Sequence, residues 1–212
     1  MLIRSTLVAA LIASPAVAGT ITFNDGWQEQ RLSLFSSNDY VFGEGLLMES
    51  AGTVSIAWTR LPEAEWDAAS ASWSWTVDES VPPTDLSVKG GDDRNLSVYF
   101  VFVPQDVAPD LADADIRALL GRDDVRVMQY AWGGSNPVGE VIPSPYGEAG
   151  TGVTIPLAQA GTGSRMEQVD LAADYDRAFG GEACALIGLA VSGDSDDTES
   201  RIVASMSAIT LE

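Results

Sequence analysis

Large apolar residues alternate with small or polar ones along much of this chain. Over 54–58 and again over 71–77, every second residue is apolar, a period typical of strands with one buried face. The runs 96–103 and 183–191 are apolar almost throughout, which predicts central strands covered on both sides. Further strands are expected over 46–50, 125–132, 153–157, 166–169 and 202–211.

Two short helices are predicted between these strands. The first has Leu111, Ile116, Leu119 and Leu120 on one face and ends before Gly121. In the second, Leu171, Tyr175, Ala178 and Phe179 share a face, Asp170 is the expected N-cap, and Gly180 is the expected left-handed terminator. Because helices and strands do not alternate regularly, we predict a mainly all-β fold, a β-sandwich of jelly-roll type with two short helices. The segment 133–152 is rich in glycine and proline, which predicts a long loop.

The first 18 residues have the pattern of an export signal. Arg4 precedes an apolar stretch over 7–13, and Ala16-Val17-Ala18 forms a small-residue cleavage site. We expect cleavage near Ala18, a periplasmic or secreted location, and one domain over 19–212. No later segment is apolar enough to predict membrane insertion.

Charge and composition restrict the function classes. The chain has 31 acidic residues against 11 basic ones, no histidine, and a net charge of −20. Such a field repels nucleic acid and favours cationic or neutral ligands. Because the sequence contains no histidine, catalysis that needs an imidazole side chain is excluded. Cys184 is the single cysteine, so the fold is expected to do without an internal disulfide, as a monomer with this thiol buried and inert.

Lys89, the only lysine, stands in Lys89-Gly90-Gly91-Asp92-Asp93, just before a predicted buried strand. These charged side chains are candidates for ligand binding. In an enzyme, Asp92 and Asp194 would form an acid and base pair, with Lys89 as their charge partner. The alternative is a glycine turn closed by an ion pair, which we favour over a site.

The densest run of acids is Asp194-Ser195-Asp196-Asp197-Thr198-Glu199, between two predicted strands. Asp194, Asp196 and Asp197 are candidate ligands for calcium, which takes six to eight oxygen ligands. The run does not match the helix-loop-helix calcium motif. A solvated polar loop without a metal explains the sequence equally well.

Three of the six tryptophans carry a prediction, and they divide into two groups. Trp73 and Trp75 share one strand face opposite Ser72, Ser74 and Thr76, which predicts that both rings lie in the core rather than in a groove. Trp132 ends its strand before Gly133-Gly134, at the opening of a loop, and is with Tyr130 a candidate for stacking on a ligand.

Several ordered motifs together resemble an exported bacterial family, domain of unknown function 3047. They are Trp73-Ser74-Trp75-Thr76-Val77, Lys89-Gly90-Gly91-Asp92-Asp93, Tyr130-Ala131-Trp132-Gly133, Asp174-Tyr175 with Ala178-Phe179-Gly180, and Asp194-Ser195-Asp196-Asp197-Thr198. One departure is that Ser97 stands where the family pattern has an arginine, and Arg94 is displaced toward the start of the motif. An anion-binding role tied to that arginine is therefore not expected here. The resemblance implies no activity.

Three functions remain open. We favour a non-catalytic β-sandwich that binds a glycan or another neutral or cationic ligand, with calcium supporting the loop near Asp194. The alternative is a glycosidase or polysaccharide lyase that uses carboxylates. A structural envelope protein is the third.

Overall fold

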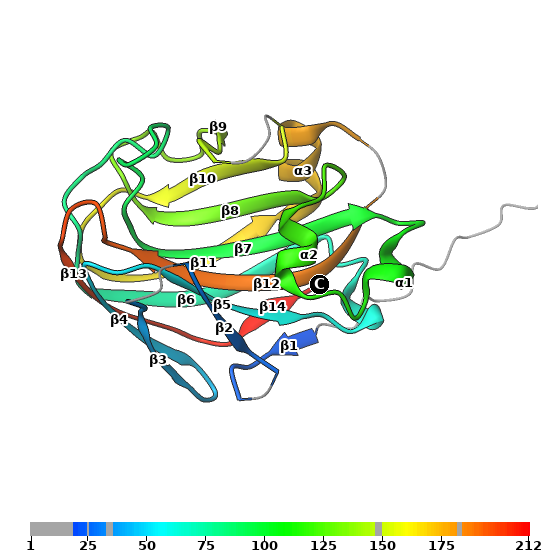
Figure 1. Cartoon of the computed structure of the whole chain (residues 1–212), viewed down its shortest axis with the longest axis horizontal. Coiled ribbons are helices and arrows are strands. Elements are labelled where there is room, and N and C mark those ends of the chain that lie inside the picture. The colour runs from blue at the N-terminus through cyan, green and yellow to red at the C-terminus, as the bar shows by residue number, and fades with distance from the viewer. Residues whose placement is uncertain (1–18, 25, 33–35, 147–149, 182–183) are drawn as a thin grey trace, which may run out of the picture.

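Two seven-stranded sheets pack face to face in the computed structural model, which describes residues 19–212 except 25, 33–35, 147–149 and 182–183 (Figure 1). The predicted β-sandwich of jelly-roll type is therefore confirmed. The predicted signal peptide, residues 1–18, lies outside the described residues.

The first sheet, sheet A, is built around the long strand β6 (Ser70–Glu79). On one side of β6 lie β13 (Arg201–Met206) and β14 (Ile209–Leu211), and β11 (Gly163–Asp170) pairs along the other. Next to β13 lies β4 (Leu46–Ala51), followed by β3 (Asp39–Phe42). Next to β14 lies β1 (Gly19–Ile21).

The second sheet, sheet B, has its two longest strands at the centre. Its order is β2 (Gln28–Arg31), β5 (Ser55–Arg60), β12 (Cys184–Asp194), β7 (Arg94–Pro104), β8 (Arg126–Gly133), β10 (Gly152–Ala158) and β9 (Ile142–Pro143). Every neighbouring pair is antiparallel except β8 and β10, which are parallel.

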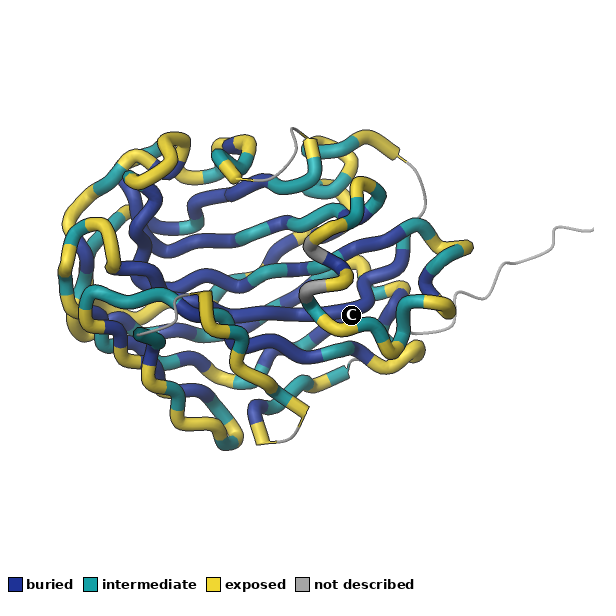
Figure 2. The backbone as a smooth tube through the Cα atoms, in the orientation of Figure 1, coloured by how far each residue is buried: buried dark blue, intermediate teal, exposed yellow. Residues whose placement is uncertain are grey.

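The core lies between the sheets, and Figure 2 shows buried positions along the central strands. Trp73 and Trp75 of β6 are 3% and 1% exposed, as their alternation with serine and threonine predicts. The Trp73 ring lies 6.1 Å from Phe100 of β7. Burial of such large aromatic surfaces dominates the stability of a core.

The helices follow the sequence signals with one correction. The second predicted helix is α3 (Leu171–Phe179), capped by the Asp170 carboxylate, which accepts from the Ala173 amide, and ended by Gly180 at φ 80°. The first is split into α1 (Ala108–Leu111) and α2 (Ile116–Leu120), because Asp115 caps a new helix by accepting from the Ala118 amide. A 3-10 turn, η1, spans Glu63–Glu65. Among the described residues, none of the helices has the length and apolar character needed to cross a membrane.

Four short strands were not predicted. β1, β2 and β3 have only three or four residues each and little apolar alternation, and β9 lies inside the segment 133–152 that the sequence predicts as a loop. Cys184 stands at the start of β12, half-buried rather than fully buried as expected. Burial raises the pKa of its thiol, which keeps the sulfur protonated and unreactive.

Candidate ligand face and acidic cluster

One face of sheet B is turned away from the core and carries polar and aromatic side chains. In β7 the residues Val98 and Phe100 point inward, so Tyr99 points outward, and in β8 the inward Met128 and Tyr130 leave Gln129 outward. Tyr99 and Gln129 are direct cross-strand partners, and both are half-buried. The outward side chains of neighbouring strands are therefore placed side by side on one surface.

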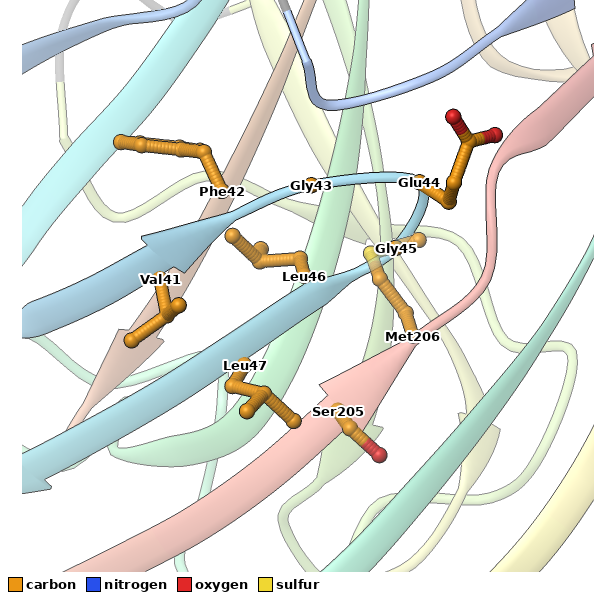
Figure 3. Close-up of a pocket in the computed structure, with 9 residues that line it drawn as sticks. All are labelled: Val41, Phe42, Gly43, Glu44, Gly45, Leu46, Leu47, Ser205 and Met206. Carbon is orange, nitrogen blue, oxygen red and sulfur yellow. The ribbon is translucent and has the colours of Figure 1, made fainter.

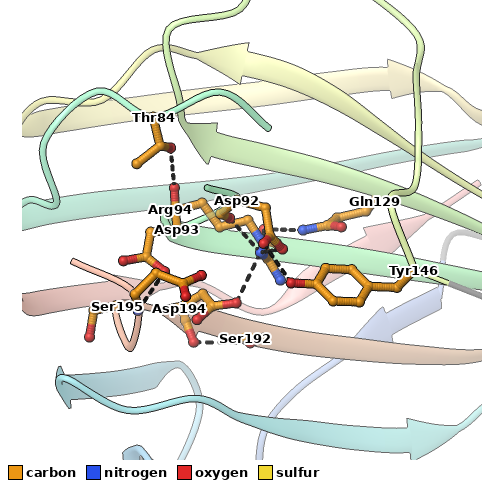
Figure 4. Close-up of polar contacts among 12 residues, drawn as sticks. Thr84, Asp92, Asp93, Arg94, Gln129, Tyr146, Ser192, Asp194 and Ser195 are labelled. Carbon is orange, nitrogen blue, oxygen red and sulfur yellow. Dashed lines mark hydrogen bonds and ion pairs between the residues drawn. The ribbon is translucent and has the colours of Figure 1, made fainter. Parts of the chain in front are cut away.

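A buried arginine anchors one end of this face. Arg94, at the start of β7 and 7% exposed, donates through Nη1 to Oδ2 of both Asp92 and Asp194 at 3.1 Å, and through Nη2 to the Tyr99 hydroxyl at 2.7 Å (Figure 4). Its Nε donates to the Ser97 hydroxyl at 3.1 Å. We call Asp92, Arg94, Ser97, Tyr99 and Asp194 the Arg94 network.

The network places two acids close together. Asp92 and Asp194 are each 8% exposed and come from positions about a hundred residues apart, joined by the pairing of β7 with β12. Because one oxygen of each lies 3.1 Å from the same nitrogen, these two oxygens are at most about 6 Å apart. The sequence hypothesis that Asp92 and Asp194 meet in one place holds geometrically.

Burial and neighbouring charges shift the pKa values of Arg94 and Asp194 by different balances of causes. Burial disfavours the charge of Arg94, but Tyr99, Asp194 and Asp92 outweigh that cost and raise its pKa, so the guanidinium stays charged. The pKa of Asp194 is raised to about 7, mainly by burial and against the lowering effect of Arg94, with smaller raising contributions from the carboxylates of Asp196, Asp93 and Asp92. Oδ1 of Asp194 is buried and has no hydrogen-bond partner among the described residues.

Tyr146 covers the network from the segment between β8 and β10. Its hydroxyl donates to Oδ1 of Asp92 at 2.8 Å, and burial followed by this hydrogen bond raises the pKa of Tyr146 to about 12. The Lys89 ammonium lies over the Tyr146 ring, 5.2 Å from its centre. Lys89 therefore joins the cluster through an aromatic ring; the ion pairs between described residues assign it no carboxylate partner.

A second group of acids lies beside the network. Carboxylate oxygens of Asp93, Asp196 and Asp197 all lie within 4.8 Å of one another. We call these three residues the acidic trio. The sequence hypothesis grouped Asp194 with Asp196 and Asp197. The structure puts Asp93 in that place, because consecutive side chains of an extended segment point in opposite directions, and Asp92 takes the side of Arg94.

The outward pair Tyr99 and Gln129 is held by further hydrogen bonds. The Gln129 amide nitrogen donates to the Ser97 hydroxyl at 2.8 Å, and its oxygen accepts from the Thr154 hydroxyl at 3.0 Å. Ser97 thus connects Gln129 with Arg94. An amide with two donors and two lone pairs keeps one of each for another molecule.

Another aromatic ring occupies the same face but is covered. Trp58 of β5 pairs with Ala190 of β12, which pairs in turn with Tyr99. The Arg60 guanidinium lies 5.0 Å from the Trp58 ring centre and donates to the carbonyls of Asp113 and Ala114. Trp58 is 7% exposed, so Arg60 and the segment between α1 and α2 shield this end of the face.

Two predicted ligand residues are corrected by the structure. Tyr130 and Trp132 are 0% and 4% exposed and point between the sheets, where Trp132 meets Trp75 edge-on at 5.7 Å. The Tyr130 hydroxyl donates to Asp174 of α3 at 2.7 Å. Gly133-Gly134 does open a loop, but the inward alternation of β8 decides where the Trp132 ring lies. Neither ring offers a surface to a ligand.

Two surface hollows lie elsewhere. One, of about 340 Å³, is lined by the turn between β3 and β4 with Ser205 and Met206 of β13 (Figure 3). Another, of about 370 Å³, lies between α3 and the turn at Trp66, with Cys184 at its edge. Both have mainly apolar walls and neither contains a residue of the Arg94 network or the acidic trio.

The acids of the site were thus predicted from the sequence, but the outward face of sheet B was not. Lys89, Asp92, Asp93 and the acids from Asp194 to Asp197 do converge, whereas Tyr130 and Trp132 do not join them. Tyr99, Ser97 and Gln129 were not predicted. The signal for them was present, because each takes the outward place in an alternating strand.

Comparison with known proteins gives a family and a fold. The model of the family described as "Protein of unknown function (DUF3047)" matches residues 25–210. None of the curated proteins matches this sequence.

Solved structures that resemble the chain include two carbohydrate-related domains. One is the xyloglucanase domain of NopAA, a type three effector from Sinorhizobium fredii, in complex with cellobiose, with 8% identity, a TM-score of 0.48, and coverage of 94% of this chain and 100% of that domain. Another is the catalytic domain of Humicola grisea Cel12A, in complex with a thio cellotetraose, with 11% identity, a TM-score of 0.44, and coverage of 92% and 94%. Both TM-scores are below 0.5, and these two proteins give no ground for assigning this chain a substrate.

Proposed function

Since the chain belongs to the family of unknown function DUF3047, whose description carries no activity, we propose from geometry that it is a non-catalytic binding protein for a neutral, glycan-like ligand. The ligand lies on the outward face of sheet B. The observation that carries this proposal is the cross-strand pair of Tyr99 and Gln129, half-buried and held in place by Arg94 and Ser97.

The chemistry of this pair suits a molecule with both apolar faces and hydroxyl groups. The Tyr99 ring supplies a flat apolar surface, and its hydroxyl, which accepts from Arg94, keeps its own proton for an acceptor. The Gln129 amide keeps one N–H and one lone pair. A ring beside a paired donor and acceptor is the usual arrangement of a site that fixes the orientation of a ligand.

The pair is also preorganised. Both side chains are fixed by groups that are themselves buried, because Arg94 is 7% exposed and Ser97 is fully buried. A ligand therefore meets side chains that already have their bound positions, which reduces the entropic cost of binding. The net charge of −20 disfavours polyanionic ligands and leaves neutral ones.

A screen of neutral oligosaccharides on an array, followed by calorimetry with the best binder, tests the proposal. We expect Tyr99→Ala to weaken binding at least about tenfold, because truncating an aromatic anchor costs more than about 1.4 kcal/mol. Gln129→Ala should weaken it by about two- to tenfold through the lost hydrogen bond. The matched control is Met166→Ala on sheet A, where the side chain is 81% exposed. Unchanged affinity in Tyr99→Ala, or no neutral binder at all, overturns the proposal.

A glycosidase is the second candidate, and the closeness of Asp92 and Asp194 favours it. Carboxyl groups about 5 Å apart suit a retaining mechanism. Binding without catalysis ranks first for two reasons. Arg94 donates to one oxygen of each acid and Tyr146 donates to the other oxygen of Asp92, and both acids are almost fully buried. Release of reducing ends from the array hits, lost in Asp92→Asn, would reverse this order. If neither binding nor release is detected, the structural envelope protein is what remains.

A further inference from the structure

A row of outward side chains crosses sheet B from the Tyr99 and Gln129 pair to Trp58. Gln129 of β8 pairs with Tyr99 of β7. Tyr99 pairs with Ala190 of β12, which pairs in turn with Trp58 of β5. Directly paired residues of a sheet project to the same side, and Tyr99 and Gln129 project away from the core, so all four lie in one line on the outward face. This line runs across the strands rather than along them.

Arg60 stands at the far end of this line. It follows Trp58 by two residues in β5, so its side chain leaves the sheet on the same side. Its guanidinium lies 5.0 Å from the centre of the Trp58 ring. Nε donates to the Ala114 carbonyl at 2.8 Å, and Nη2 donates to the Asp113 carbonyl at 3.0 Å. The aromatic ring and the two carbonyls therefore fix the guanidinium before any ligand arrives.

Arg60 keeps hydrogen-bond donors that the protein does not use. A guanidinium has five N–H groups in a planar fork, and the contacts between described residues use one on Nε and one on Nη2. Both hydrogens of Nη1 and the second hydrogen of Nη2 have no acceptor among those residues. None of the ion pairs in the described part of the chain includes Arg60, and its side chain is only half-buried. A fixed, charged donor of this kind is suited to oxygen atoms of a ligand.

From the line and the fixed donor we infer that Arg60 is a second anchor of the ligand face, and that the ligand is an unbranched oligosaccharide of at least three sugar units lying across the strands. This inference rests on the proposed function, because Tyr99 and Gln129 hold the other end of the ligand. From β8 through β7 and β12 to β5 there are three spacings of about 4.8 Å, which places the two anchors about 14 Å apart. One spacing is close to the length that one sugar ring adds to an extended chain. A disaccharide held at Gln129 and Tyr99 therefore ends over β12, whereas a longer chain reaches Arg60.

The strand between the two anchors leaves room for such a chain. On β12 the outward position opposite Tyr99 is Ala190, and the outward position opposite Arg60 is Gly188. These two residues have the smallest side chains available, and neither is charged. No long side chain of β12 therefore projects between Tyr99 and Arg60, and an extended neutral ligand can contact both.

Calorimetry with oligosaccharides of increasing length tests this inference. The probes are unbranched β-1,4-glucans, β-1,4-mannans and α-1,4-glucans of two to six units. In the series that binds best, affinity should rise at least about tenfold between two and four units and then level off, because hydrogen bonds to a charged donor are strong ones. Arg60→Met keeps a side chain that packs on Trp58 but removes the donors. It should reduce this gain to less than about threefold and leave the affinity of the disaccharide within about twofold.

Arg126→Met is the matched control. Arg126 is also half-buried and donates to two main-chain carbonyls, those of Asp123 and Val125, but it pairs with the inward-pointing Phe102 and so lies off the outward face. This variant removes the same charge and should keep the full gain with length. If Arg60→Met does not fold, Arg60→Lys replaces it. Lysine keeps the charge but donates from a single atom, so it too should lose most of the gain.

Failure of this inference can be told from failure of the proposed function. If oligosaccharides bind and Tyr99→Ala weakens them, but the gain with length is the same in Arg60→Met as in the original chain, the face binds glycan and Arg60 is not an anchor. An equal loss for two and four units in Arg60→Met overturns the inference as well, since Arg60 would then act only by holding the fold. So does an equal loss of gain in Arg126→Met, which would assign the effect to overall charge. If no probe of any length binds the original chain, the proposed function fails and this inference fails with it.

Discussion

The Arg94 guanidinium donates to the Tyr99 hydroxyl at 2.7 Å, and so connects the outward face of sheet B with two buried acids. One buried cation thus serves both stability and the proposed ligand site. Substitution of Arg94 is expected to change both stability and ligand affinity. Substitution of its buried acids should change mainly stability, and substitution of Tyr99 should change mainly affinity.

Arg94→Met should destabilise the protein by about 3–5 kcal/mol, because it leaves Asp92 and Asp194 buried without their cation. Urea unfolding at neutral pH measures the loss. As the control, Arg31→Met breaks a surface pair with Glu29, in which the two side chains are 64% and 28% exposed, and should cost no more than about 0.5 kcal/mol. A loss below about 1 kcal/mol at Arg94 would mean that the network is not the buried ion cluster described above.

Asp194 should make stability depend on pH. Its pKa is raised from 3.8 to about 7 in the folded chain, so the folded state holds this proton more tightly than the unfolded state does. The resulting stabilisation is complete below about pH 4 and disappears as pH rises through 7.

The comparison of Asp194→Asn with the original chain isolates this effect. Because asparagine imitates the protonated acid, the difference in unfolding free energy should move in favour of the variant between pH 4 and pH 7. Urea unfolding at several pH values provides the measurement. A difference that does not change over this range would show that Asp194 titrates normally.

Trp132→Phe should lower stability while leaving ligand affinity unchanged. The Trp132 ring is 4% exposed and packs against Trp75, so a smaller ring loses contacts and leaves a void, at a cost of about 1–3 kcal/mol. Affinity is measured on protein that remains folded at low temperature. If affinity for the array hit falls tenfold in such protein, the ligand reaches Trp132 and the core assignment is wrong.

Gly133→Ala should disturb the network through the backbone of β7. A Cβ at Gly133 would lie 2.6 Å from Cβ and 2.7 Å from Cα of Arg94, and backbone atoms cannot move aside as the end of a side chain can. We expect destabilisation of about 1–3 kcal/mol and weaker ligand binding. Gly43→Ala is the control, because the new Cβ there would meet only a carbonyl oxygen at 3.7 Å. Equal thermal melting of the two variants would contradict the close approach.

The alternation of side chains was enough to predict most of the sandwich. Each predicted strand segment contains a strand, although 202–211 is divided into β13 and β14, and Trp73 and Trp75 point inward as their serine neighbours indicate. The same rule, applied to β8, would have placed Tyr130 and Trp132 inside with Met128. The glycines that follow Trp132 suggested a loop position, but the strand continues to Gly133 and its inward face holds the ring.

The site depended on contacts that no local pattern contains. Asp92 and Asp194 are brought to one nitrogen by the pairing of β7 with β12, which are remote in sequence. The sequence predicts Asp194 beside Asp196 and Asp197, but the structure has Asp93 there. The difference depends on the directions in which the Asp92 and Asp93 side chains point. Arg94 stands near the acids in the sequence, but only the fold shows that its Nε donates to the Ser97 hydroxyl.

The parallel pairing of β8 with β10 has a consequence for the surface beside Asp92. Parallel neighbours cannot be joined by a tight hairpin, so the chain must travel the length of the sheet before β10 begins. That return path carries Tyr146 to Asp92. Changes in the length or composition of this path would alter the surface beside Asp92 without changing the pairing of β7 with β8.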